Sequence, residues 1–316
     1  MESTSYHPLF QVTQDEMKTV RQSYNLDVKI INENLDIIEE WFKKQEHLVE
    51  ALPYITRDML ERFHILGRGS IEKTKAVIDK VLTVRGMLPE FFSFDTNTIF
   101  NELDTFLDNM ILAPLPKINP KDCTRIFVLR LMNKNFEDIN VVEVARFCCF
   151  LIQMRMLYEY TFAHHLVWDM KHLKASAVTK LNPIVLRKIE VVFTDSYKAR
   201  VKGLHFINAP PFINKIIAIF NLVLKEKIAK RIHVHSTYED LYKHISKEVL
   251  PEDYGGEEMS CQDISKHLKE FIKSETGRRV IEQSSKMVAN ETKRSSLKFN
   301  EEYMGMPGSF KQLNFD

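Results

Sequence analysis

Residues 201–236 constrain the fold more than any other stretch, because they read as a strand, a long helix and a second strand in direct succession. An apolar run at 204–207 ends at two prolines, and no further proline or glycine follows within 212–224. Apolar residues recur there at the i, i+4, i+8 spacing of one helix face, and Ile219 and Leu222 lie on the opposite side. The segment is therefore either an ordinary crossover helix on a sheet or a movable lid with one face on an apolar cavity.

The cations of this stretch are concentrated around the helix. Residues 197–236 contain eight Lys and Arg side chains and one acidic side chain, which leaves a local charge of +7, whereas the whole chain carries +1. Cations at a helix C-terminus stabilise the helix dipole, which is the structural explanation. They also suit a surface that meets an anionic membrane. The nearly neutral whole chain argues against a general nucleic-acid binder, so no nucleic-acid partner is expected.

The composition limits the class of protein. A chain of 316 residues with 44% hydrophobic residues can form one large domain and a smaller one. No uninterrupted apolar run of about 18 residues occurs, and the first 20 residues lack the apolar centre of a signal peptide. These features predict a cytoplasmic protein. The cysteines are too few for a disulfide framework and are expected to be reduced; they are Cys123, Cys148, Cys149 and Cys261.

The order of the expected elements predicts helices first and an α/β part afterwards. Helices are expected at residues 15–48, 56–66 and 70–86. The apolar stripe of the first helix is expected to be Leu26, Ile30, Ile37, Ile38 and Trp41. Strands at 125–132, 166–169, 204–207 and 232–234 alternate with helices at 140–160, 183–193 and 210–224, and a helix at 258–273 follows. This alternation indicates a mostly parallel sheet with crossover helices.

Three stretches together carry a family resemblance. They are VFTDSYKARVKGLHFIN at 192–208, LPEDYGG at 250–256, and Arg62-Phe63 followed by IEKTKA at 71–76. In this combination and spacing they resemble the CRAL-TRIO family of lipid-binding proteins, most closely its tocopherol and retinaldehyde carriers. The resemblance covers roughly residues 45–275.

The resemblance implies a division of the chain into four parts. Residues 1–12 are expected to form a flexible leader and residues 13–95 a helical N-terminal domain. Residues 96–275 are expected to form the lipid-binding domain, whose sheet is the floor of a cavity covered by the 210–224 helix. Residues 276–316 are expected to wrap over the surface, and their last nine residues are similar to the tail of arthropod members.

The resemblance also assigns the lining of the cavity by position. The lid contributes Ile216, Phe220 and Val223, and the 140–160 helix contributes Phe150, Leu151 and Met154. The other expected lining residues are Trp168, Leu173, Leu181, Ile189, Val192, Phe193 and Leu204. Alternation along the 204–207 strand puts Phe206 on the same face as Leu204. Each of these residues taken alone is more often plain core than pocket.

A membrane-binding surface follows from the same comparison. The positions that match the phosphoinositide-binding patch of tocopherol carriers are Arg200, Lys202, Lys227 and Arg231. Ile213 and Ile219, on the outer side of the lid, are expected to contact the membrane. A basic run that the family usually has after its first bundle helix is replaced here by residues 63–67, and Arg68 lies one position away, so Arg68 is not assigned to the patch.

Motifs for catalysis and metal binding do not support an enzyme. Residues 67–70 lack the third glycine of a dinucleotide loop, and neither a P-loop nor a GxSxG motif occurs. His233 and His235 share one strand face, and the pair His164-His165 offers a further ligand. No carboxylate stands at a suitable spacing near either pair, so packed histidines are favoured over a metal site. No cofactor and no metal are expected.

The sequence therefore predicts an intracellular, non-enzymatic carrier of a tocopherol, retinoid or carotenoid type of lipid. Its expected partners are that lipid and a phosphoinositide-containing membrane, at which the lid helix opens, and a monomer is expected. One alternative is a phospholipid exchange protein, for example for phosphatidylinositol, which needs polar partners for a headgroup. Another is a membrane-recruited regulatory scaffold of the same fold, whose cavity holds no lipid.

Overall fold

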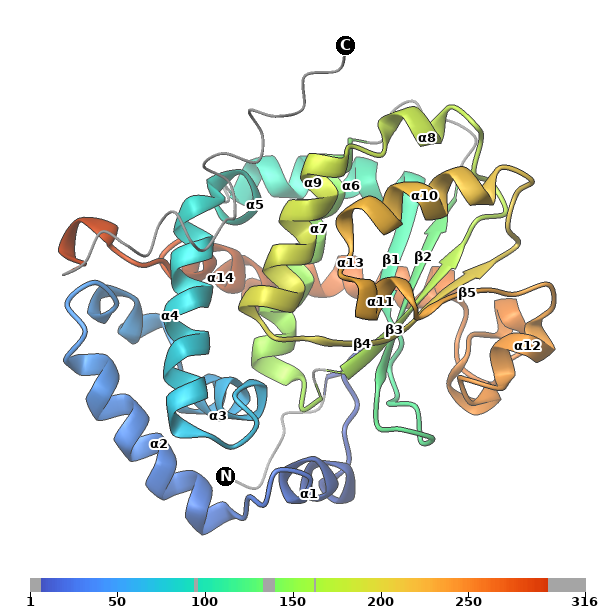
Figure 1. Ribbon diagram of the computed structural model, residues 1–316. Helices are drawn as coiled ribbons and strands as arrows, with labels where there is room; N and C mark the ends of the chain where they lie inside the picture. Colours follow the sequence, from blue (N-terminus) through green and yellow to red (C-terminus); the bar gives the residue numbers. More distant parts are fainter. Residues whose placement is uncertain (1–6, 94–95, 133–139, 162, 295–316) are drawn as a thin grey trace.

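The computed structural model describes residues 7–93, 96–132, 140–161 and 163–294, and it places a group of N-terminal helices beside a five-stranded sheet (Figure 1). The N-terminal elements are α1 (Gln14–Gln22), α2 (Val28–Lys43), η1 (Val49–Tyr54), α3 (Arg57–Leu66), α4 (Ile71–Met87) and α5 (Pro89–Phe92). The strands are β1 (Met110–Pro114), β2 (Arg125–Leu131), β3 (Ala163–Asp169), β4 (Arg200–Ile207) and β5 (Ile232–Val234).

Helices connect and cover these strands. Those that precede or join strands are α6 (Thr96–Asn109), α7 (Val141–Tyr158), α8 (Ala177–Lys180), α9 (Pro183–Glu190), the π-helical η3 (Val191–Ser196), α10 (Ile213–Val223) and α11 (Glu226–Ala229). After the last strand come α12 (Tyr238–Tyr242), η4 (Lys247–Val249), η5 (Glu252–Tyr254), α13 (Cys261–Lys273), α14 (Glu275–Ser284) and η6 (Glu291–Lys293). None of the described helices is long and apolar enough to cross a membrane.

The strands lie in the order β1-β2-β3-β4-β5, with β1 antiparallel to β2 and the other four strands parallel. Each parallel pair is joined by a helical crossover. The mostly parallel α/β sheet predicted from the sequence is confirmed. The edge strand β1 and the helix α6 are not among the predicted elements. Helix and strand meet directly between Asn109 and Met110, with no glycine or proline to mark the boundary.

The two faces of the sheet carry different side chains. Phe127, Leu166 and Leu204 are paired across β2, β3 and β4 and therefore lie on one face. Val128, Val167 and His205 are paired in the same way on the other face. We call the face of Phe127, Leu166 and Leu204 the cavity face.

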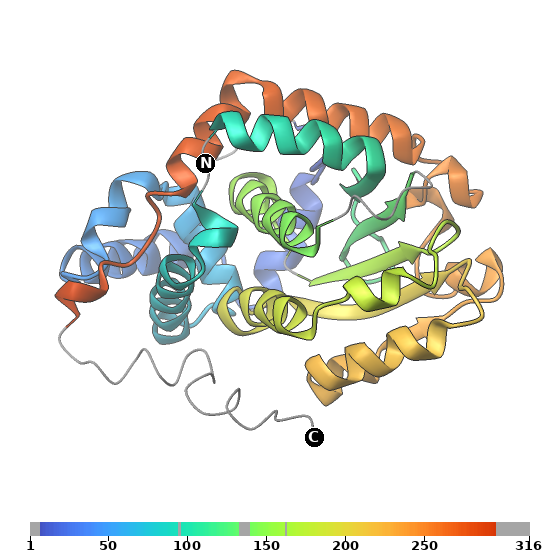
Figure 2. The same cartoon turned by 90° about the horizontal axis from the view of Figure 1, so that it is seen from above.

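Helix α7 joins the sheet to the N-terminal helices. Phe150 and Met154 belong to the core around the sheet, whereas Cys149 and Met156 belong to the core of the N-terminal helices. A helix that is buried on several sides is apolar nearly all round, as α7 is. Seen from above, α7 lies between α6 on one side and α9 on the other (Figure 2). The position of α7 therefore fixes the two parts of the chain relative to each other.

The first predicted helix is wrong in two respects. Residues 15–48 form α1, α2 and the turn before η1 rather than one helix, because the chain turns at Asn25, whose φ is 55°, and Asp27 caps α2 by accepting from the Ile30 amide at 2.8 Å. The apolar stripe of α2 is also shifted by about one residue. Ile30 and Ile37 are 39% and 50% exposed. The residues of α2 that are buried are Ile31, Leu35, Ile38 and Phe42.

The expectation of a flexible leader is wrong for residues 7–12. Leu9 and Phe10 are buried in the core around the sheet. The ring of His7 packs on Tyr158 and Phe271, with ring centroids 4.5 Å apart in both pairs. Residues 1–6 lie outside the described part of the chain.

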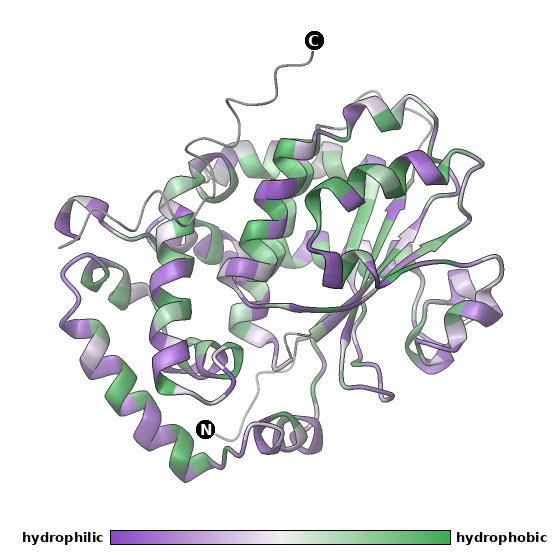
Figure 3. Ribbon diagram, viewed as in Figure 1, coloured by the Kyte–Doolittle hydropathy of each residue, from purple (hydrophilic) through white to green (hydrophobic). Residues whose placement is uncertain are grey.

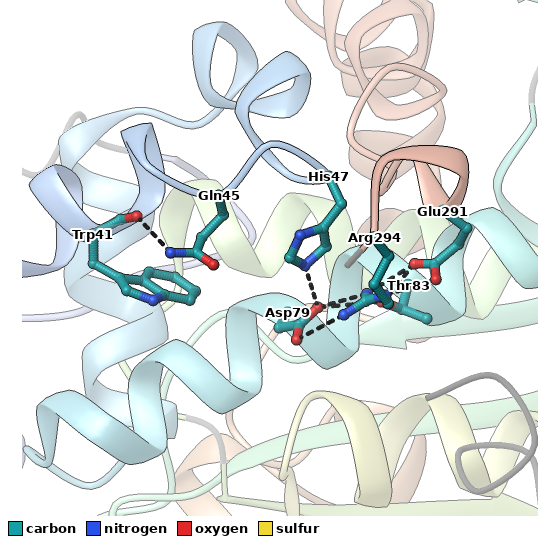
Figure 4. A network of polar contacts seen from close by, with 7 residues as sticks. All are labelled: Trp41, Gln45, His47, Asp79, Thr83, Glu291 and Arg294. Carbon is teal, nitrogen blue, oxygen red and sulfur yellow. Dashed lines mark hydrogen bonds and ion pairs between the residues drawn. The ribbon is translucent and has the colours of Figure 1, made fainter. Parts of the chain in front are cut away.

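The C-terminal extension runs back along α4 (Figure 4). Arg294 donates to Asp79 at 2.8 Å and to the Thr83 hydroxyl at 2.7 Å, and it pairs with Glu291. His47 lies 3.2 Å from the same Asp79 carboxylate. These contacts tie η6 and Arg294 to the N-terminal helices. Residues 295–316, which include the stretch similar to arthropod members, lie outside the described residues.

Candidate functional site

Only part of the cavity face of the sheet packs directly against the helices that cover it. A cavity of about 190 Å³ lies between this face and α7, α9, η3, α10 and α11. Figure 3 shows hydrophobic residues along α9 and α10, whereas α2 and α4 alternate between hydrophobic and hydrophilic. The lining is accordingly dominated by aliphatic and aromatic side chains.

Six of the residues expected to line the cavity do so: Leu151, Ile189, Phe193, Leu204, Phe220 and Val223. The lining also contains apolar residues to which the sequence analysis assigns no such place. They are Leu112, Phe127, Leu129, Val144, Cys148, Ile152, Leu166, Leu186, Val201, Leu224 and Ile228. Strand register could have identified the sheet residues in this list, because Phe127 and Leu166 lie in line with the expected Leu204 on the neighbouring strands.

The eight other expected residues lie around the cavity but not on its wall. Trp168 and Phe206 form an aromatic group with Phe220, with ring centroids 5.8 to 5.9 Å apart. Together with the buried Ile216 they belong to the core around the sheet, into which α10 packs. Phe150, Met154, Leu173 and Leu181 pack in or against the same core. Val192 points the other way and is buried in the core of the N-terminal helices.

Residues 210–224, which the resemblance predicts to form a lid, contain α10, and α11 follows after the extended Leu224. Helix α10 packs against α9, and α11 packs against β4. Three polar contacts hold the junction: Arg187 donates to the Val223 carbonyl oxygen at 3.3 Å, and Lys225 pairs with Asp195 and, at 3.8 Å, with Glu190. The lid is therefore attached to α9 and η3 by side chains at one end.

The outer side of α10 differs from the expectation at Ile213 and at Leu222. Ile213 and Ile219 are half-buried, and Ile213 packs against the core around the sheet. Leu222 is 80% exposed, the highest value among the exposed large hydrophobic residues of the described chain. Its position opposite the apolar face was visible in the sequence, but it is not among the residues expected to contact a membrane.

Four side chains of the lining are polar, and three of them have partners. Thr194 donates to the Glu190 carbonyl oxygen at 2.9 Å and also to the Glu190 carboxylate. Arg155 donates to the Thr161 carbonyl oxygen at 2.9 Å. Burial lowers the pKa of Arg155 to about 10, so its guanidinium is still charged at neutral pH. The fourth polar residue is His164, which is buried on the cavity face of β3.

A second hollow, of about 370 Å³, lies between the N-terminal helices and the start of β4. Its wall includes the expected Arg200 and Lys202 together with Arg68 and Lys198. The Arg200 guanidinium lies 5.5 Å from the centroid of the Tyr24 ring. Arg68, which the sequence analysis did not assign, lies in the turn between α3 and α4 and lines this hollow together with the start of β4. We call this hollow the basic hollow.

The other two expected patch residues lie on and after α11. Lys227 is exposed, and Arg231 donates to the carbonyl oxygen of Val201, which stands between Arg200 and Lys202. Part of the local charge is neutralised, because Lys230 pairs with Glu226 and Lys225 pairs with Asp195. The described residues provide no such ion pair for Lys198, Arg200 or Lys202.

The opposite face of the sheet carries a cluster of five histidines, His165, His205, His233, His235 and His244. Nδ1 of His165 lies 2.8 Å from Nε2 of His205, and Nδ1 of His205 lies 2.8 Å from Nε2 of His235. Nε2 of His165 reaches Asp122 at 3.1 Å. The rings of His233 and His244 pack against His205 at centroid distances of 5.1 Å. The described residues contain no group of three or more ligands that fits a metal ion.

Comparison with known proteins identifies the domain. Residues 109–256 match the model of the CRAL/TRIO domain. The matched range contains all five strands and the elements from α7 to α12, so the cavity and the histidine cluster lie within it. This part of the chain is a CRAL/TRIO domain, and the resemblance predicted from the sequence is confirmed.

Curated relatives match over part of their length. The alpha-tocopherol transfer protein-like protein of Mus musculus is 28% identical over 171 residues, which are 53% of this chain and 49% of that protein. Its Homo sapiens counterpart is 27% identical over 173 residues, with the same shares. Clavesin-2 of Rattus norvegicus is 35% identical over 92 residues, which are 29% of this chain and 28% of that protein. The chain thus spans about half the length, or less, of these curated relatives.

Among solved structures, the crystal structure of Sfh5 matches 78% of this chain and 89% of its own chain, at 12% sequence identity and a TM-score of 0.38. This likeness is too low to support a conclusion.

The histidine cluster predicts a specific pH dependence of stability. Burial, reinforced by neighbouring imidazoles, lowers the pKa of His205 to about 2 and that of His235 to about 4. In the unfolded chain both groups titrate near pH 6.5. The unfolded state therefore binds more protons below that value, so stability is fully present above about pH 6.5 and falls as the pH is lowered towards 4.

Urea unfolding between pH 7.5 and 4.5 measures this loss. We expect His235→Gln to show a shallower loss than the wild-type protein, because glutamine does not titrate. Equal pH dependence in the two proteins would contradict the assignment of a depressed pKa to His235.

Proposed function

We propose that this protein binds an apolar lipid of the tocopherol, retinoid or carotenoid type in the cavity and carries it between membranes. The observation that supports this proposal is an apolar hollow, about 190 Å³ in volume, between the sheet and a helix that is apolar on two sides. The family of the domain and the name of the Mus musculus relative agree with a lipid ligand. Helix α10, which the sequence analysis expects to be the lid, contributes Phe220 and Val223 to the wall of this cavity.

The free energy of lipid burial is large enough for a carrier. A lipid that buries about 400 Å² of apolar surface gains roughly 10 kcal/mol at 25 cal/mol per Å². Ordering the lipid and closing the lid take back several kcal/mol. Escape into water is then slow, so release requires a second interaction that opens the lid.

The size of the cavity indicates how a lipid enters. Sites for drug-sized ligands measure about 300–1,000 Å³, whereas this cavity measures about 190 Å³. A lipid of the proposed type therefore fits only when neighbouring side chains move. Phe220 of α10 lines the cavity and packs against Trp168 and Phe206, which lie outside its wall. We propose that displacement of Phe220 with α10 extends the cavity along the lid.

We further propose that the basic hollow and the lid bind a phosphoinositide-containing membrane. Arg68, Lys198, Arg200 and Lys202 supply the cations around the hollow. Each cation near an anionic leaflet contributes about 1 kcal/mol. The exposed Leu222 lies on the lid, where it enters the interface. Anionic headgroups compete for Lys225, whose pairs with Asp195 and Glu190 hold the lid junction.

A cavity-filling substitution tests the carrier function. Leu166→Trp places an indole in the cavity, and Leu222→Trp adds the same group on the outer side of the lid as a matched control. We expect an organic extract of the purified wild-type protein to contain a bound lipid, identified by mass spectrometry. Occupancy is expected to fall roughly tenfold or more in Leu166→Trp and to persist in Leu222→Trp.

The identity of the extract separates the alternatives. A co-purified phospholipid would indicate an exchange protein, and wild-type protein that takes up no lipid would indicate a scaffold. Equal loading of the two tryptophan variants would contradict the proposed cavity.

Charge reversal tests the membrane surface. Arg200→Glu combined with Lys202→Glu removes two cations from the basic hollow and adds repulsion, so binding to phosphoinositide vesicles is expected to weaken roughly tenfold or more while lipid loading is unchanged. The control, Lys44→Glu combined with Lys266→Glu, makes the same change of charge at exposed positions, one at the C-cap of α2 and one on α13. Vesicle co-sedimentation measures both. An equal decrease in the two double variants would show that only net charge matters and would rule out a specific surface.

A further inference from the structure

His164 and His165 are adjacent in β3, and their side chains lie on opposite faces of the sheet. The register with β4 shifts between these two residues. His165 points into the histidine cluster and uses both ring nitrogens, one with His205 and one with Asp122. His164 lines the cavity, where its ring meets Phe127 and Phe193 edge-on at centroid distances of 6.0 and 6.5 Å.

The imidazole of His164 is buried without its full set of hydrogen bonds. His164 is 8% exposed, and its Nδ1 has no hydrogen-bond partner among the residues that the structure describes. Burial, with a smaller contribution from the charge of Arg155, holds the pKa of His164 well below its usual value. The ring is therefore neutral at physiological pH and offers one donor and one acceptor. A buried polar atom without a partner is costly, so its retention calls for an explanation.

The other polar residues of the lining already have polar partners. Thr194 and Glu190 bond to each other, and Glu190 also pairs with Arg187 and Lys225. Arg155 donates through Nη2 to a backbone carbonyl oxygen and the nearby Glu159 carboxylate offsets its charge, while its Nε has no hydrogen-bond partner among the described residues. The rest of the wall is apolar. A charged headgroup needs several donors, whereas this wall leaves the neutral His164 ring and the Nε–H of Arg155.

We propose that the lipid carried by this protein bears one uncharged hydrogen-bonding oxygen, a hydroxyl or a carbonyl, at the end that enters the cavity, and that His164 binds this oxygen. The inference rests on the proposed carrier function and adds the chemistry of the ligand to it. The remainder of the lipid is hydrocarbon, because the wall beyond His164 consists of side chains such as Leu166, Leu204 and Val201. His164 thus determines which end of the lipid enters first.

A ligand pair with matched chains tests the inference. Displacement of bound Nile red by 1-hexadecanol and by hexadecane, both delivered from cyclodextrin, gives an affinity ratio for each protein. In His164→Phe the preference for the alcohol over the alkane is expected to fall roughly fivefold to tenfold, which corresponds to one neutral hydrogen bond. The ratio does not depend on the fraction of active protein. The control is His267→Phe, which makes the same exchange on α13, outside the cavity, and should leave the ratio unchanged.

Two further measurements separate hydrogen bonding from packing. His164→Asn keeps a side chain that donates and accepts, so it should recover part of the preference that phenylalanine abolishes. In protein labelled with ¹⁵N at the histidine rings, 1-hexadecanol is expected to shift the His164 ring resonances, and hexadecane to leave them in place.

The outcomes are distinct. If both lipids bind but the ratio is the same in His164→Phe and wild type, the role of His164 is wrong and the carrier function stands. If palmitate at pH 7.5 binds tenfold more tightly than 1-hexadecanol, the ligand carries a charged oxygen and the inference is wrong. If no lipid displaces Nile red from the wild-type protein, the carrier function and the inference are both overturned.

Discussion

The structure depends on how the cavity face of the sheet is covered. A parallel sheet must be covered on both faces, and here the second face packs through Val128, Val167 and the histidine cluster. On the cavity face the helices leave a void of about 190 Å³. Side chains that border such a hollow lack packing partners on that side, which weakens the core. In the proposed function a lipid that fills the hollow supplies these partners, so the same defect in packing would provide affinity.

The proposed lid, α10 with α11, is held by interactions of two kinds that respond to different surroundings. The aromatic contacts of Phe220 with Trp168 and Phe206 depend on exclusion of water. The pairs of Lys225 with Asp195 and Glu190 are partly exposed, and such pairs contribute little and compete with other anions. An anionic bilayer offers both an apolar interior for α10 and headgroups for the cations. In our account a membrane can therefore replace the interactions that close the lid, whereas water cannot replace them.

The sequence predicted the order and type of most elements, because periodicity and prolines mark them. It predicted the wall of the cavity less well, since an apolar residue borders a void or a neighbour according to packing in three dimensions. Leu204 and Phe206 share one face of β4, yet one lines the cavity and the other is covered by Trp168 and Phe220. For the neighbouring histidines of β3 the sequence analysis weighed a further metal ligand against plain packing and favoured packing, although alternation along a strand sends the two side chains to opposite faces. Arg68 reaches the basic hollow through a tertiary contact that no sequence spacing encodes.

Hydrogen–deuterium exchange of α10 and α11 tests the central claim most directly. The amides of both helices are measured by mass spectrometry in delipidated protein, in lipid-loaded protein, and in lipid-loaded protein with phosphoinositide vesicles. The account predicts that loading slows exchange in the lid and that vesicles accelerate it again, while the amides of β2, β3 and β4 stay protected throughout. Identical exchange of the lid in all three states would contradict the claim that this segment opens at a membrane.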